Sequence, residues 1–156
     1  MHPLRFRGNV YVDGWPAWHE FDLLGNATLY LTLLEDDSPA WPERLEALRA
    51  RLGAVPDFLA NARAVLGRPP RVVTEMVQRT NAGNLRFFEE GLPPLFARAP
   101  ALAADLRAAN ARAIAALREF QGWVGETLLP RSDGDWRLGR ARWTRKLHLT
   151  LQSDMD

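Results

Sequence analysis

Apolar residues recur at helical spacing through most of the chain, and the clearest run lies between residues 100 and 129. Its apolar positions are three or four residues apart: Leu102, Leu106, Ala109, Ala113, Leu117, Phe120, Val124 and Leu128. Charged side chains fall mostly off this stripe, which is typical of a helix that packs one face against a core. At 1.5 Å per residue, such a helix is a rod of roughly 43 Å, a length typical of helical bundles.

A second apolar stripe runs from residue 45 to residue 66 with the same alternation of three and four. Its members are Leu45, Leu48, Leu52, Val55, Leu59, Ala62 and Leu66. Gly53 and Pro56 interrupt the stripe. Because glycine weakens a helix and proline removes a main-chain donor, we expect either a kink or two helices end to end.

A third helix is expected between residues 70 and 91. Its inner face would carry Val73, Met76, Val77, Thr80 and Phe88. Its middle, residues 80–84, consists of poor helix formers, and Asn84 falls on the apolar stripe. Two interpretations of Asn81 and Asn84 stay open. They mark a helix break with satisfied amides, which we favour, or they line a ligand cleft.

Helical patterns also cover residues 15–34 and residues 138–151, whereas residues 8–12 fit a short extended segment. The sequence therefore predicts an all-α fold, a bundle of about five to six helices with one long member. The length of 156 residues suits one domain, residues 1–156.

Composition and charge exclude several classes of protein. The chain has no cysteine, which excludes a disulfide scaffold, a thiolate nucleophile and a cysteine zinc site. The net charge of +1 makes nucleic acid an unfavoured partner. No apolar run approaches the roughly 18 residues of a membrane span, and the N-terminus does not have the pattern of a secretory signal. We therefore expect no membrane span and a cytoplasmic location.

The residues that carry most enzyme chemistry form no recognisable site. The three histidines are His2, His19 and His148. His19 and Glu20 begin like the zinc motif H-E-x-x-H, but the second histidine position holds Leu23. Ser132 has no visible base beside it in the sequence. We expect no catalytic residue, no metal ligand and no cofactor in this chain.

Trp136 and Arg137 lie in a turn-rich segment between Gly134 and Gly139. A tryptophan in such a segment commonly anchors a loop to the core, and the neighbouring arginine can cap or pair. The alternative is that Trp136 and Arg137 face a ligand. Together with Asn81 and Asn84, they are the candidate cleft or ligand-facing residues of the chain.

Several motifs resemble a large bacterial family known as the domain of unknown function 885. They are residues 69–75 (PPRVVTE), the long alanine-rich helix, residues 129–139 (LPRSDGDWRLG) and residues 140–154. The resemblance covers roughly Asp22 to Asp156. It implies a largely helical protein. Members of the family are much longer chains, and they are often described as lipoproteins or peptidases. They resemble zinc metallopeptidases of the H-E-x-x-H type, with a helical lobe over a cleft.

The resemblance reaches only the front, helical part of that family. In such enzymes two histidines hold zinc and a glutamate activates the bound water, but no residue here matches those positions. The resemblance thus implies zinc and a peptide substrate for a full-length member only. Ser153 and Asp154 form a helix N-cap pair with no helix after them. We expect this chain to be a fragment of a larger protein.

Three hypotheses for the function follow. The first is a helical lobe of a metallopeptidase-like protein, inactive alone; the second is a stand-alone helical binding or scaffold module; the third, an enzyme complete in this chain, is the least supported. A lobe cut from its protein would expose an apolar patch, which we expect to include Trp143, Leu147 and Leu151, and would self-associate through it.

Overall fold

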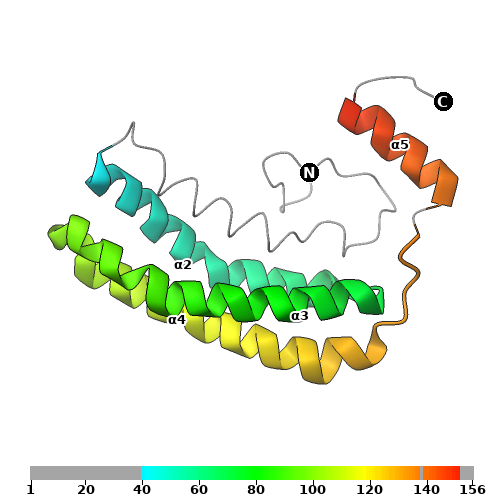
Figure 1. The fold of residues 1–156 in the computed structure, drawn as a ribbon, viewed down its shortest axis with the longest axis horizontal. Coiled ribbons are helices and arrows are strands. Elements are labelled where there is room, and N and C mark those ends of the chain that lie inside the picture. The colour runs from blue at the N-terminus through cyan, green and yellow to red at the C-terminus, as the bar shows by residue number, and fades with distance from the viewer. Residues whose placement is uncertain (1–39, 138, 152–156) are drawn as a thin grey trace.

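Three long helices lie side by side and a shorter helix follows them (Figure 1). The computed structural model describes residues 40–137 and 139–151. Its α-helices are α2 (Trp41–Val65), α3 (Arg71–Arg86), α4 (Ala103–Trp123) and α5 (Gly139–Leu151). These ranges contain no strand, and the all-α class predicted from the sequence is confirmed.

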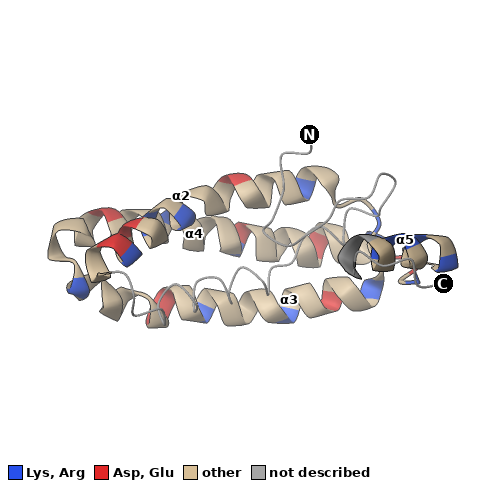
Figure 2. Ribbon diagram, turned by 90° about the horizontal axis from the view of Figure 1, so that it is seen from above, with Lys and Arg blue, Asp and Glu red and all other residues tan. Residues whose placement is uncertain are grey.

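Helix α4 lies between α2 and α3 (Figure 2) and packs against both. In Figure 1, α2 and α4 run in the same direction and α3 runs in the opposite one. In the described ranges, no helix is both long and apolar enough to cross a membrane.

The predicted number of helices is slightly too high, because residues 40–137 and 139–151 form four α-helices. The expected helix over residues 15–34 and the extended segment over residues 8–12 lie outside the described residues. The last helix is where the pattern placed it. It begins at Gly139, whose φ of 72° is a conformation that glycine adopts without strain.

Helix α2 is continuous through Gly53 and Pro56, so the alternative of two helices end to end is wrong. Proline removes one main-chain hydrogen bond, and tertiary packing on both sides offsets that loss. Leu52 and Leu59 flank Pro56 and are 0% and 3% exposed. The axis of α2 bends along its length in Figure 1, as a proline inside a helix leads one to expect.

Helix α3 also continues where a break was expected, through residues 80–84. The predicted inner face is partly wrong, since Met76 is 45% exposed while Phe88 is 4% exposed. The side chains that α3 buries fully are polar, namely Thr74 and Asn81. Hydrogen bonds from these polar residues add to the apolar contacts that Val77 and Leu85 of α3 make with the core.

The apolar core lies mainly between α2 and α4, with the turn after α3 closing one end. All positions of the stripe predicted over residues 100–129 are buried, except Leu102, which is half-buried. On α2 the buried apolar side chains are Leu45, Leu48, Leu52, Leu59 and Ala62. Phe96 and Phe120 are the largest fully buried side chains.

Helices α3 and α4 both widen at their C-terminal ends into one π-helical turn, Phe87–Gly91 and Val124–Leu128. In the first of these, the Leu92 N–H donates to the Phe87 carbonyl at 3.0 Å, five residues back. Short 3₁₀ turns follow: Pro93 is the first residue of one, and Pro130 is the second residue of the other. Such a π turn leaves main-chain carbonyls for side chains to satisfy.

Candidate functional site

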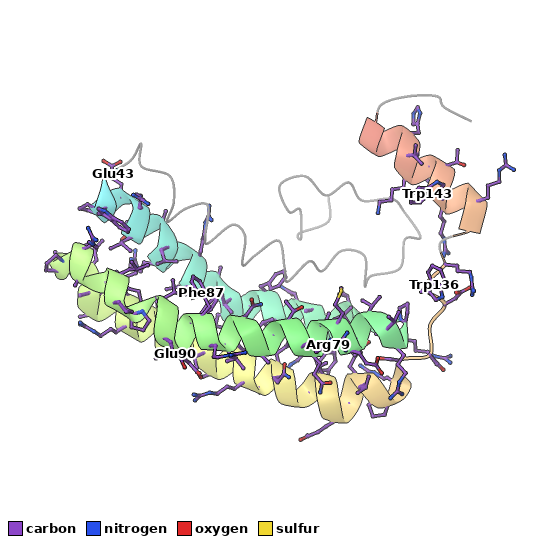
Figure 3. The ribbon with its side chains drawn as sticks, viewed as in Figure 1. Glu43, Arg79, Phe87, Glu90, Trp136 and Trp143 are labelled. Atoms are coloured by element: carbon purple, nitrogen blue, oxygen red, sulfur yellow. The ribbon has the colours of Figure 1, made fainter. Side chains whose placement is uncertain are left out.

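The four residues expected to face a ligand lie in two separate pairs. Asn81 and Asn84 are on α3, whereas Trp136 and Arg137 are in the segment that joins α4 to α5. Figure 3 shows Trp136 beyond the end of the three long helices, close to the start of α5. The structure therefore does not assemble these residues into one cleft.

Asn81 is fully buried between α3 and α4. Its amide nitrogen donates to the Leu117 carbonyl at 3.1 Å and to the Gln121 side-chain oxygen at 2.8 Å. Its side-chain oxygen is buried and has no hydrogen-bond partner. Asn84, one turn further, is half-buried. The amide nitrogen of Asn81 thus joins the two helices, whereas its oxygen is unsatisfied, and α3 does not break at this point. The role of Asn81 and Asn84 in facing a ligand stays a prediction.

Further polar side chains extend this contact along the α3–α4 interface. We name the set the polar seam: Thr74, Gln78 and Asn81 on α3, with Asn110, Gln121 and Ser132 on the α4 side. The Gln121 side-chain nitrogen donates to the Gln78 carbonyl at 3.1 Å. The hydroxyl oxygens of Thr74 and Ser132 lie 2.7 Å apart. The polar seam therefore spans most of the length of α3.

Asn110 satisfies a carbonyl at the π-helical turn after α3. Its side-chain nitrogen donates to the Phe88 carbonyl at 2.8 Å, and Asn110 is 4% exposed. Because a buried carbonyl without a partner costs free energy, this bond stabilises the wide turn. The sequence analysis missed Asn110. A signal for the polar face of α3 is present in the sequence, because Thr74, Gln78 and Asn81 are four and then three residues apart.

Ser132, the nucleophile candidate of the sequence, is bonded within the polar seam. It is 5% exposed, and its hydroxyl donates to the Leu128 carbonyl at 2.7 Å. Its second hydrogen-bonding neighbour is the Thr74 hydroxyl, and neither group acts as a base. Elsewhere on the surface, Glu89 accepts a hydrogen bond from Arg118 at 2.6 Å.

The segment after α4 is fixed to the loop that precedes α3. The Arg68 guanidinium donates two hydrogen bonds to the Asp133 carboxylate, one of them from Nε to Oδ1 at 2.7 Å. The Gly134 N–H donates to the Pro69 carbonyl at 3.2 Å. Arg131 donates to the Leu66 carbonyl at 3.2 Å. These bonds determine where the chain leaves the three-helix layer.

The charge of Arg68 changes the acidity of Asp133. The hydrogen bonds from Arg68 lower the pKa of the Asp133 carboxyl below its ordinary value. A lowered pKa means that this contact stabilises the fold above the ordinary aspartate pKa and is lost only as the pH falls through the lower, folded value. Both side chains are largely exposed, so solvent screens the pair.

Trp136 is exposed rather than docked, so the interpretation of an anchor is wrong for this residue. The ring is 59% exposed, and the Arg137 guanidinium stacks 4.7 Å from its centroid. The Arg137 N–H donates to the Asp135 carboxylate at 3.0 Å. A cation stacked on an exposed indole orients the ring without burying it. The role of Trp136 and Arg137 in facing a ligand stays a prediction.

The family model described as "Bacterial protein of unknown function (DUF885)" matches residues 4–156. The chain belongs to this family. The resemblance inferred from residues 69–75 and 129–139 is thereby confirmed, and the match begins earlier than expected, at residue 4. The family description states no activity. No curated protein and no solved structure matches the chain.

The described part of this DUF885 chain does not fit a zinc ion. Residues 40–137 and 139–151 contain no group of three or more His, Asp or Glu side chains placed to hold a metal. His148 is exposed on α5, whereas His2 and His19 lie outside the described residues. No chemical step through a metal is therefore derived for this chain.

The apolar patch expected on the DUF885 chain stays a prediction, although one of its three residues is exposed. Trp143 is 54% exposed and Leu147 is half-buried, while the side chain at position 151 lies outside the described set. Two further exposed apolar residues, Val72 and Met76, lie four residues apart on α3. Self-association through such a surface stays a prediction.

Replacing Gly134 with alanine is expected to lower the free energy of unfolding by about 1–2 kcal/mol. The added Cβ would collide with the Arg68 carbonyl oxygen and would lie 3.1 Å from the Pro69 carbonyl carbon. Urea unfolding followed by circular dichroism measures the effect. Gly67→Ala in the neighbouring loop is the matched control, because nothing lies within 4 Å of its Cβ. Equal losses in the two variants would contradict the described contact.

Proposed function

We propose that this chain forms a helical lobe of a metallopeptidase-like protein and has no catalytic activity on its own. The observation that supports the proposal is that buried polar groups form hydrogen bonds within the fold. In the polar seam, the nitrogen of Asn81 and the hydroxyl of Ser132 bond to main-chain carbonyls. Groups held in this way support the packing of helices and present no reactive atom to a substrate. The peptidase-like part of the proposal rests on the resemblance to the family.

In this proposal the lobe is a rigid support for the segment that follows it. The apolar contact of α2 with α4 and the polar contact of α3 with α4 fix the three helices. Arg68 and Gly134 then fix the start of the exposed segment against them. A full-length protein would use such a lobe to cover and position a cleft formed elsewhere. A peptide substrate and zinc belong to that full-length protein.

A stand-alone binding or scaffold module is the second candidate, and one observation favours it. Trp136 is 59% exposed with a guanidinium stacked on it. Exposed tryptophan and arginine are the residues most often found at the energetic centre of interfaces. In this alternative the chain acts without a catalytic partner. The cytoplasmic location expected from the sequence accompanies either candidate as a prediction.

Zinc is expected to leave the thermal midpoint of the 156-residue chain unchanged. A ligand that binds only the native state raises this midpoint, whereas a lobe without a metal site does not respond. Thermal unfolding with excess zinc and with EDTA measures the effect, and the same samples are assayed against a mixed peptide substrate. A midpoint raised by zinc, or peptide turnover that EDTA abolishes, would overturn the proposal. His148→Ala then tests whether the described helices supply a ligand.

A further inference from the structure

Positive charge is concentrated at one end of the chain. The whole sequence is nearly balanced, with 20 basic and 19 acidic residues. Between Asp135 and Asp154, however, no acidic residue occurs, while five basic ones do: Arg137, Arg140, Arg142, Arg145 and Lys146. Figure 2 shows the Lys and Arg positions of α5 in blue. This helix therefore attracts a negatively charged surface.

Helix α5 carries an apolar face that is bordered by basic side chains. Trp143 and Leu147 are four residues apart and share this face. Arg140 lies three residues before Trp143 and Lys146 three residues after it, so they border the face on its two sides, and both are exposed. Trp143 is 54% exposed, so its ring is available to a ligand. An apolar face bordered by basic side chains is the pattern of a helix that lies in a membrane interface.

We propose that α5 binds the surface of a membrane that contains anionic lipids. Trp143 enters the headgroup region, where the amphipathic indole ring is favourably placed. Arg140 and Lys146 then contact lipid phosphates, to which the guanidinium of Arg140 donates paired hydrogen bonds. The helix is about 20 Å long, which suits a segment lying flat on the surface. This inference is independent of the function proposed above.

The charge pattern favours a lipid surface over an acidic protein partner. A protein partner offers carboxylates at fixed positions, so it binds tightly only where its charges match the spacing of the basic side chains. Every charged residue of α5 has the same sign, and an anionic lipid surface presents a negative charge opposite each of them. The surface of a bilayer also accommodates an exposed tryptophan without a preformed pocket.

The preceding segment adds to the same surface. Trp136 is 59% exposed and precedes α5, with Arg137 stacked on it. Figure 3 shows Trp136 and Trp143 at the same end of the molecule, on the right of the view. The contacts of Asp133 and Gly134 fix the start of this segment to the loop before α3. The second tryptophan enlarges the apolar area available to the membrane.

Vesicle binding tests the proposal with the full chain. We expect the chain to sediment with vesicles of equal parts phosphatidylcholine and phosphatidylglycerol and to stay in solution with phosphatidylcholine alone. Each basic residue at an anionic surface strengthens binding about fivefold, so R140Q together with K146Q should weaken it about 25-fold. The matched control is R107Q with R112Q, two exposed arginines of α4, which should bind as the unchanged chain does.

Tryptophan fluorescence provides the second readout. Anionic vesicles should shift the emission to shorter wavelength, and W143F should reduce that shift while keeping the circular dichroism spectrum. Equal sedimentation with both vesicle types, equal losses in the two double variants, or an unchanged shift in W143F would overturn the proposal. Binding to duplex DNA as tight as to anionic vesicles would assign these basic residues to nucleic acid instead. Dimerisation that R140Q with K146Q abolishes would assign them to self-association.

Discussion

Replacing Phe120 with alanine is expected to lower the free energy of unfolding by about 3–5 kcal/mol. Phe120 is 1% exposed in the last turn of α4, and its ring lies 5.5 Å from the ring of Trp123. Removing the ring loses its burial and leaves a cavity that helices on both sides close only in part. Urea unfolding followed by far-ultraviolet circular dichroism measures the change.

Val72→Ala is the control for that variant. Val72 is 57% exposed on α3, so its truncation should change the free energy of unfolding by no more than about 0.5 kcal/mol. If Phe120→Ala and Val72→Ala had similar effects, the apolar core between α2 and α4 would not be the main source of stability. The slope of the free energy against urea should stay the same in both variants.

Replacing Asn81 with alanine should cost about 2–3 kcal/mol of unfolding free energy. The variant removes two hydrogen bonds across the α3–α4 interface and leaves the Leu117 carbonyl buried without that partner. A buried polar group without a partner carries the cost of its desolvation, which exceeds the net value of an ordinary hydrogen bond. The same urea experiment measures the loss.

Asn84→Ala separates this loss from the intrinsic preference of asparagine. Asn84 has the same side chain on the same helix, but it is only half-buried. Because alanine is the better helix former, Asn84→Ala should be neutral or slightly stabilising. A loss at Asn84 as large as that at Asn81 would mean that helix propensity, and not the polar seam, determines the effect.

The apolar pattern predicted α4 well because its stripe is unbroken and its buried residues are almost all apolar. Leu106, Ala113 and Leu117 are buried where spacing placed them. The same logic placed the inner face of α2, but it overestimated the effect of Pro56. Local propensity favours a break at proline, whereas the burial of leucines on both sides keeps the helix continuous.

Sequence reasoning was weakest on α3, because the buried face of that helix is polar. A rule that assigns apolar residues to the interior placed Met76 inside, whereas the structure exposes it and buries Thr74. The partners of Asn81 lie on α4, at Leu117 and Gln121. Periodicity within one helix carries no information about a partner so distant in the sequence. The break expected at residues 80–84 was wrong for the same reason.

The sequence identified candidate site residues, but it did not predict how they are arranged in space. The pattern identified Trp136 and Arg137 as unusual, yet turn chemistry alone did not show that Trp136 is exposed. The fixed position of this segment depends on Arg68 and Asp133, which come together only when the loops before α3 and after α4 meet. Such a contact follows from the tertiary fold and not from local sequence.

The polar seam also determines the axial register of α3 against α4. Two helices that touch only through leucines can slide by a turn, about 5.4 Å, at little cost in apolar contact. The amide of Asn81 meets the carbonyl of Leu117 at one offset only, and Asn110 meets Phe88 at that same offset. In a slipped alignment, both amides would be buried without their hydrogen-bond partners. The seam therefore selects a single packing for the helix pair in the way that a buried asparagine aligns a coiled coil.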